Sequence, residues 1–118
     1  MKKIFALLSV LSVAAFANWS GTTSTPASIT VGSDVFYEVS SPEELAWFAS
    51  QVNSGHPAIN AILKNDIVFF EDSLTETNKG SAHAWTPISY SPENAFSGVF
   101  EGNGHKIKGL YLQDHDYS

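Results

Sequence analysis

Residues 96–112, FSGVFEGNGHKIKGLYL, constrain the fold more than any other part of this sequence. Phe96, Gly98 and Phe100 alternate with polar or outward positions, which is the period of a β-strand. Residues 102–104, Gly-Asn-Gly, all tolerate positive φ and predict a sharp turn. The segment therefore predicts a strand, a tight turn and a resumed strand.

The inward-facing positions do not keep one parity after this turn. Ile107 is followed by Leu110 and Leu112, so the parity slips by one residue at Lys108-Gly109. A flat hairpin keeps its parity, whereas a strand that turns a corner around a common core does not. The slip favours a β-solenoid, and a small β-meander or hairpin domain with one helix is the alternative.

Residues 1–17 have the three parts of a signal peptide in order. Lys2 and Lys3 form a charged start, residues 4–16 are almost all apolar, and residues 15–17 give a small-x-small cleavage pattern. The run is shorter than the about 20 residues of a membrane-spanning helix. We expect export from a bacterial cell, to the cell surface or the medium. A short buried or amphipathic helix is the alternative.

The charge balance of residues 18–118 excludes several classes of partner. This part carries four lysines, no arginine and twelve acidic residues, for a formal charge of −8. Nucleic acids, phosphate ligands and anionic membranes favour basic groups, so we expect none of them as a partner. We also expect no membrane span after the signal is removed. Cysteine is absent, so burial alone must hold the fold.

One helix is predicted with both of its ends. Ser41 is placed to cap it, Pro42 suits the first helical position, and Glu44 completes a Ser-x-x-Glu capping box. Gly55 suits the left-handed residue after the last turn. The spacing of the apolar residues predicts one buried stripe, made of Leu45, Phe48, Ala49 and Val52.

Trp47 lies outside this stripe and is a candidate ligand contact. An outward Trp is either covered by another segment or available to a ligand such as a sugar ring. We favour cover by residues 29–39, which contain a predicted strand at residues 35–39. Tyr111 is the second candidate ligand contact, because it has the outward parity of its segment.

The remaining segments are a lead-in, a strand region and a long polar stretch. Residues 18–34 are rich in Ser and Thr and predict a flexible lead-in or an extended edge segment. Residues 61–70 predict a strand with a corner at Asn65. Residues 71–95 are too long for a simple loop, and Trp85 is expected to anchor them to the body.

Four pieces in fixed order carry a family resemblance: SPEELAWFASQVNSG, NAILKNDIVF, WTPI and FSGVFEGNGHKIKGLYL. Together they resemble the N-terminal part of bacterial secreted right-handed β-helix proteins of the GLUG-repeat, adhesin-like family. The resemblance covers residues 35–112. It implies a right-handed parallel β-helix, closed at its N-terminal end by the helix. The residues given structural roles in this architecture are Ser41, Glu44, Gly55, Trp85, Phe96, Phe100, Gly102, Asn103, Gly104, Ile107, Gly109, Leu110 and Leu112.

The C-terminus departs from the family pattern. Such proteins continue into further rungs, whereas this chain ends in the residues QDHDYS, 113–118. An uncapped solenoid end exposes unpaired backbone. We therefore interpret residues 35–118 as the cap and first rungs of a truncated solenoid. Its partners are expected to be further rungs of the same polypeptide or a capping protein.

No catalytic signature is present, and no cofactor is predicted. The sequence has no G-x-S-x-G elbow, H-E-x-x-H, P-loop or dinucleotide fingerprint. Asp114 and Asp116 form a half-site for Ca²⁺ at most, since calcium takes six to eight oxygen ligands.

These features favour a non-catalytic, adhesin-like or scaffold module that contacts polysaccharide or cell-surface partners. The alternative is the start of a β-helix polysaccharide lyase or glycoside hydrolase with its catalytic residues beyond residue 118. A small binding domain built on a hairpin at Asn103-Gly104 is a third hypothesis.

Overall fold

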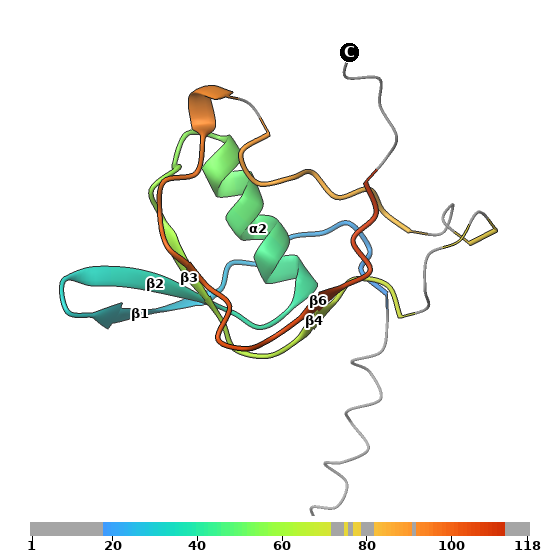
Figure 1. Ribbon diagram of the computed structural model, residues 1–118, viewed down its shortest axis with the longest axis horizontal. Helices are drawn as coiled ribbons and strands as arrows, with labels where there is room; N and C mark the ends of the chain where they lie inside the picture. The colour runs from blue at the N-terminus through green and yellow to red at the C-terminus, as the bar shows by residue number, and fades with distance from the viewer. Residues whose placement is uncertain (1–17, 72–74, 76, 79–81, 91, 113–118) are drawn as a thin grey trace, which may run out of the picture.

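The computed structural model describes residues 18–71, 75, 77–78, 82–90 and 92–112. The predicted signal peptide and the Asp114/Asp116 half-site lie outside these residues. The described chain forms one α-helix and two β-sheets (Figure 1). A short 3-10 helix, η3 (Pro92–Asn94), precedes the last two strands in the sequence.

The larger sheet has four strands in the order β1-β2-β3-β5. β1 (Ala27–Val31) pairs antiparallel with β2 (Asp34–Val39) through a two-residue turn. β3 (Asn60–Leu63) adds to β2 in parallel, and β5 (Phe100–Glu101) adds to β3 in parallel. The sheet is therefore mixed, and part of the predicted lead-in is its edge strand.

The smaller sheet pairs β4 (Ile67–Val68) with β6 (Ile107–Lys108) in parallel. Phe69 N–H extends the ladder by donating to the carbonyl of Lys108 at 2.8 Å. Figure 1 shows the chain through β3 and β4 running beside the chain through β5 and β6. An isolated parallel bridge between Ala84 and Tyr111 continues this side-by-side arrangement.

α2 (Pro42–Asn53) begins and ends where the capping residues predict. The Ser41 hydroxyl accepts a hydrogen bond from Glu44 N–H at 3.2 Å. The Glu44 carboxylate accepts from the backbone N–H of Ser40 at 2.8 Å, one residue earlier than a standard capping box requires. At the other end, the N–H groups of Gly55 and His56 satisfy the last carbonyls, which is a Schellman motif.

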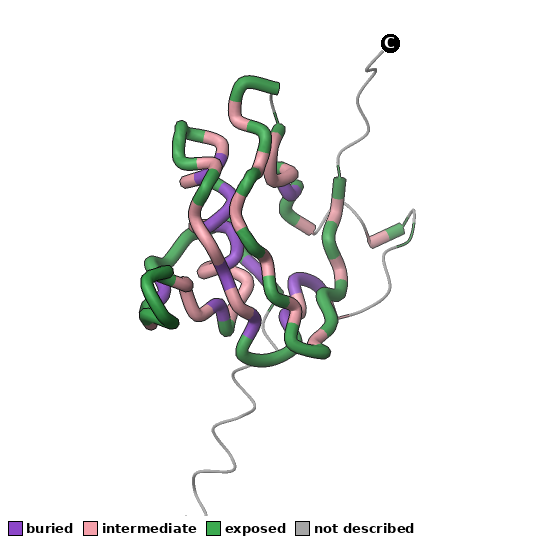
Figure 2. Tube along the Cα trace, turned by 60° about the vertical axis from the view of Figure 1, so that its left-hand side comes forward, coloured by how far each residue is buried: buried purple, intermediate pink, exposed green. Residues whose placement is uncertain are grey.

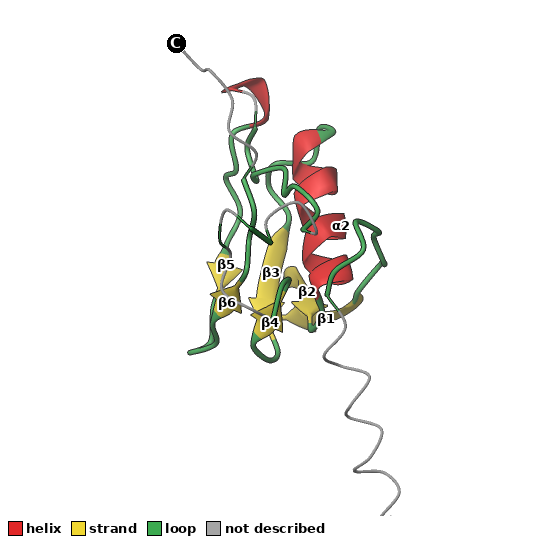
Figure 3. Cartoon of the chain, turned by 90° about the vertical axis from the view of Figure 1, so that its right-hand side faces the viewer, coloured by secondary structure: helices red, strands yellow, loops and turns green. Residues whose placement is uncertain are grey.

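The hydrophobic core lies between α2 and the strands, as Figure 3 shows with the helix alongside the sheets. Phe48 is fully buried, and its ring meets those of Phe96 and Phe100 edge-to-face at 5.8 and 6.0 Å. The buried helix positions are the predicted stripe together with Ala46. Trp85 is buried in the same core, with Ile88 packed against it.

The predicted right-handed parallel β-helix is wrong. The described residues form a mixed four-stranded sheet, a separate two-stranded sheet and one helix, with no solenoid. The parity slip has a local cause, because β6 ends at Lys108 and Gly109 has a φ of +82°. Leu110 therefore lies outside the strand, and strand parity does not apply across Gly109.

The hairpin at Asn103-Gly104 is also wrong. Both residues have positive φ, 56° and 78°, so the chain turns there as predicted. β5 and β6 nevertheless belong to different sheets, and each pairs with an earlier strand rather than with the other. Gly102, which also tolerates positive φ, does not adopt it.

Three residues predicted to face inward are exposed: Ile107, Leu110 and Leu112, which are 38%, 37% and 58% exposed. The physical reason is that none of the three packs against the core cluster of the described residues, and two of them lie beyond the end of β6. In Figure 2 the stretch that leads to the C-terminal trace has no buried position. Phe96 and Phe100, by contrast, pack against the core as predicted.

Gly98 marks a close approach between the two neighbouring runs of chain. A Cβ atom placed on Gly98 would lie 2.0 Å from the carbonyl oxygen of Ile59. Hydrogen bonds hold this approach on both sides. Ser97 N–H donates to Pro57 O at 2.7 Å, and the Asn60 side chain accepts from Val99 N–H at 2.8 Å. Only glycine fits at this position without a shift of the backbone.

Candidate functional site

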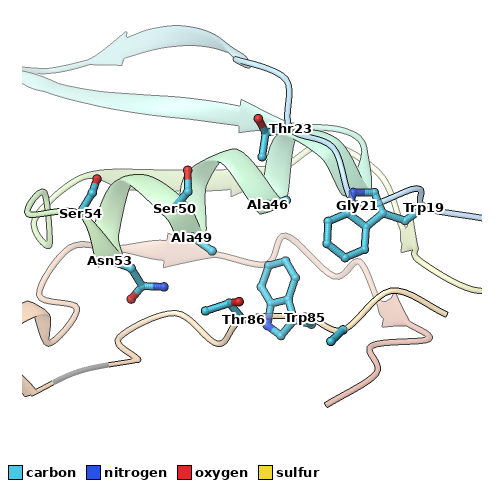
Figure 4. Close-up of a pocket in the computed structure, with 11 residues that line it drawn as sticks. Trp19, Gly21, Thr23, Ala46, Ala49, Ser50, Asn53, Ser54, Trp85 and Thr86 are labelled. Atoms are coloured by element: carbon cyan, nitrogen blue, oxygen red, sulfur yellow. The ribbon is translucent and has the colours of Figure 1, made fainter. Parts of the chain in front are cut away.

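A groove of about 450 Å³ lies along one side of α2 (Figure 4). Three segments that are far apart in the sequence form its walls: residues 19–23, α2, and residues 84–86. The volume lies in the lower half of the range of about 300–1,000 Å³ that is usual for small-molecule sites. The lining residues are Trp19, Gly21, Thr23, Ala46, Ala49, Ser50, Asn53, Ser54, Ala84, Trp85 and Thr86.

Two indole rings close one end of the groove. The Trp19 and Trp85 rings lie 6.2 Å apart at 64°, and each meets the Phe69 ring edge-to-face at 5.1 Å. Backbone hydrogen bonds hold both residues: Trp19 N–H donates to Phe69 O at 2.8 Å, and Trp85 N–H donates to Tyr111 O at 2.7 Å. The two rings are therefore pre-organised by the core.

The helix supplies a small-residue floor and a polar rim. Ala46 and Ala49 are buried, and their short side chains leave room above the helix. Asn53 ties the third wall to the helix: its side-chain amide donates to Pro87 O and its oxygen accepts from Tyr90 N–H, both at 2.9 Å. Asn53 is therefore a positioning residue with its side-chain groups already in use.

None of the described residues that line the groove carries a charge. The polar groups on its walls are hydroxyls, an amide and an indole N–H. Such a surface combines aromatic and aliphatic carbon with neutral hydrogen-bonding groups, which suits an uncharged ligand that is itself partly apolar.

The two predicted ligand contacts, Trp47 and Tyr111, lie outside the groove and are not brought together. Trp47 is half-buried, and its ring packs edge-to-face on Tyr37 of β2 at 5.0 Å. The favoured explanation for Trp47, cover by residues 29–39, is thus confirmed. Tyr111 is half-buried and contributes its backbone carbonyl to the support of Trp85.

The sequence reasoning missed most of the groove. Trp19 lies in the segment that was predicted as a flexible lead-in or an extended edge, although the residue is only 8% exposed. Ala46 and Ala49 gave a weak signal, as small residues three apart on a helix face. Thr86 belongs to the predicted W-x-P-I anchor, whose Trp85 is buried as predicted. No local pattern joins these segments, because only the tertiary fold brings them together.

A second polar cluster sits at the corner between the two sheets, away from the groove. One Asp66 carboxylate oxygen accepts from Lys106 N–H at 2.9 Å and lies 3.2 Å from His105 Nδ1. The backbone hydrogen bond from Lys106, followed by the interaction with His105, lowers the pKa of Asp66 below its ordinary value. With Asn103, which donates to Leu63 O at 3.4 Å, these contacts hold two corners of the chain together.

Other site classes find no support within the described ranges. No three His, Asp or Glu side chains there converge on a point that would hold a metal ion. The single described α-helix is too short and too polar to cross a membrane.

Comparisons with family models, curated proteins and solved structures gave no match. Membership of the GLUG-repeat family therefore stays a prediction from the sequence.

Proposed function

We propose that this chain is a secreted or surface-displayed, adhesin-like binding module without catalytic activity. Its groove beside α2 binds a saccharide of an extracellular or cell-surface polysaccharide. The observation that carries the proposal is the pair of fixed indole rings, Trp19 and Trp85, in a groove of uncharged lining. Sugar rings combine apolar C–H faces with hydroxyl edges, and aromatic side chains with a polar tip complement both.

Pre-organisation supports binding as the role of this groove. The indoles are packed into the core and hydrogen-bonded through their backbones, so little freedom is lost when a ligand docks. The groove is also lined by groups that hydrogen-bond without titrating near neutral pH. Such groups recognise hydroxyls well and have little capacity for acid-base chemistry.

The sequence of residues 1–17 supports the proposed location. These residues carry the charged start, the apolar run and the small-x-small pattern of a bacterial signal peptide. Intact-mass measurement of the chain produced in a bacterial host tests this part. Loss of residues 1–17 is expected, and a cell-associated product of full mass would contradict it.

The binding test uses the full chain, produced with its own N-terminal segment, against an array of soluble polysaccharides. Ser50 lies exposed on the groove wall, so Ser50→Arg places a long side chain at the groove. Ser28→Arg makes the same change on exposed β1, outside the groove. We expect Ser50→Arg to weaken binding at least about tenfold, or 1.4 kcal/mol, and Ser28→Arg to leave it unchanged.

If the two variants bind polysaccharide equally well, the binding site does not lie in the groove. Absence of binding by the native chain to every polysaccharide would overturn the proposed function itself. Circular dichroism of both variants checks that their folds are retained.

A further inference from the structure

The indole N–H of Trp85 has no hydrogen-bond partner among the described residues, and Trp85 is 9% exposed. Trp19 differs, because its Nε1 donates to Thr22 O at 2.8 Å. Because Trp85 lines the groove, its unused indole N–H is available to donate to a ligand there.

The indole nitrogen of Trp85 lies on the side of its ring that is next to Thr86, as Figure 4 shows. The hydroxyls of Thr86 and Thr23 make no hydrogen bond to another described residue. Ser50 Oγ donates to the Trp47 carbonyl at 2.7 Å, and its lone pairs still accept. The groove thus offers one fixed donor and several hydroxyls that rotate to donate or accept.

The charges around the groove exclude an acidic ligand. A carboxylate or sulfate that leaves water needs a cation or several donors to offset its desolvation. Among the described residues no lysine lines the groove, and Lys64 pairs with Glu38 at 3.4 Å on the sheet. Since residues 18–118 also carry a formal charge of −8, the long-range field repels anions.

The apolar part of the groove sets the shape of the ligand. Ala46 and Ala49 form a floor without polar side-chain atoms, and the two indoles border it. A pyranose ring in its chair form has an axial C–H face for this floor and a rim of hydroxyls for the groups above it. A flat aromatic ligand would use the floor and leave the hydroxyls and the indole N–H unpaired.

We infer that the groove selects an uncharged pyranose, with a ring or hydroxyl oxygen accepting the hydrogen bond from Trp85 Nε1. This inference rests on the proposed function. It adds the chemical class of the saccharide and the residue that donates a hydrogen bond to it. The Thr23, Ser50 and Thr86 hydroxyls complete the contacts at the rim.

The test is titration of the full chain with neutral and acidic polysaccharides: dextran, mannan and galactan against alginate and polygalacturonate. A Trp47→Phe background leaves Trp19 and Trp85 as the only two tryptophans, so fluorescence reports on the groove. We expect at least one neutral polysaccharide to bind and the uronates to bind at least about tenfold more weakly.

Two variants test the contacts. Trp85→Phe keeps an aromatic ring and removes the N–H, and Thr86→Val keeps the shape of an exposed side chain and removes its hydroxyl. Each should weaken binding of the neutral polysaccharide about five- to tenfold, which is the range for one hydrogen bond. Thr86→Val keeps the test decisive if Trp85→Phe does not fold, because Thr86 is exposed.

The outcomes separate the inference from the function on which it rests. Binding of uronates as tight as that of neutral polymers overturns the inference alone. Neutral binding that neither variant weakens also overturns it. Binding of no saccharide at all overturns the proposed function and the inference together.

Discussion

Replacing Gly98 by Ala tests a close approach between two runs of backbone. The added Cβ would lie 2.0 Å from Ile59 O, 2.8 Å from Ile59 C and 3.0 Å from the Ala58 carbonyl carbon. Ordinary contact begins near 3.4 Å, so the two runs of chain must separate by about 1.4 Å at this point. Both contacting groups are backbone, so no side-chain rotation relieves the overlap.

That separation has a calculable cost. Three hydrogen bonds cross the gap beside Gly98: Ser97 N–H to Pro57 O at 2.7 Å, Val99 N–H to Asn60 Oδ1 at 2.8 Å, and Ala61 N–H to Val99 O at 2.9 Å. A shift of 1.4 Å moves each beyond hydrogen-bond distance. At about 1 kcal/mol for each lost bond, the expected loss of unfolding free energy is about 3 kcal/mol.

Gly102→Ala is the matched control for this prediction. Gly102 has negative φ, and an added Cβ finds no heavy atom within 4 Å. Its unfolding free energy should stay within about 1 kcal/mol of the native value, since Ala in a compatible conformation only restricts the unfolded chain. Thermal unfolding followed by circular dichroism, and urea titration, measure both variants.

We expect Gly98→Ala to lower Tm by at least about 10 °C, at roughly 4–8 °C for each kcal/mol in a domain of this size. Gly102→Ala should shift Tm by no more than about 5 °C. A Gly98→Ala protein that unfolds with the native Tm would refute the close approach of these two runs of chain.

Three further predictions concern the core, the helix and the corner. Phe48→Ala should lower the unfolding free energy by about 3–5 kcal/mol in urea titration, because the residue is fully buried between two other rings. Ser41→Ala should cost about 1 kcal/mol through loss of the N-cap, measured against Ser28→Ala on exposed β1. Asp66 has a lowered pKa in the folded state, so its stabilising contribution is present above the unfolded pKa of about 3.9 and is lost as pH falls through the folded pKa. The difference in Tm between the native chain and Asp66→Asn should therefore be larger at neutral pH than at strongly acidic pH, and a pH-independent difference would contradict this role.

The helix was predictable because its signals are local. Ser41, Glu44 and Gly55 act on backbone groups within a few residues, so spacing alone identifies them. The turn at Asn103-Gly104 was predictable for the same reason, since both residues adopt the positive φ that their types favour.

The sheet arrangement was not predictable in this way. The parity slip after Ile107 was interpreted as a corner of a solenoid, whereas it follows from the positive φ of Gly109 at the end of a two-residue strand. A Cβ on Gly109 would also lie 2.5 Å from Phe70 N, a contact between residues about 40 positions apart. The only sign of such a tertiary contact in the sequence is the glycine itself, and a glycine has many other possible causes.

The groove illustrates the same limit for a site. Trp85 was expected to pack on the body, and it does. Its neighbour Trp19 lies in a Ser/Thr-rich stretch without periodicity, and its place depends on Phe69. The sequence instead indicated Trp47 as a candidate ligand contact, because it points away from the buried stripe of the helix. In the structure its ring packs on Tyr37. Exposure on a single helix does not predict exposure in the folded domain.

The parallel pairing of distant strands also has a consequence for how this chain folds. The Val99–Asn60 and Lys106–Asp66 contacts join residues 39 and 40 positions apart, whereas α2 and the β1–β2 hairpin close over a few residues. High contact order slows folding, because loop-closure entropy is lost before the distant contacts form. The helix and hairpin should therefore form early, and the segment from residue 99 to residue 109 should dock last. Until it docks, β3 and β4 each have an unpaired edge, which sets the period in which the newly made chain is most open to proteases and to association with other strands.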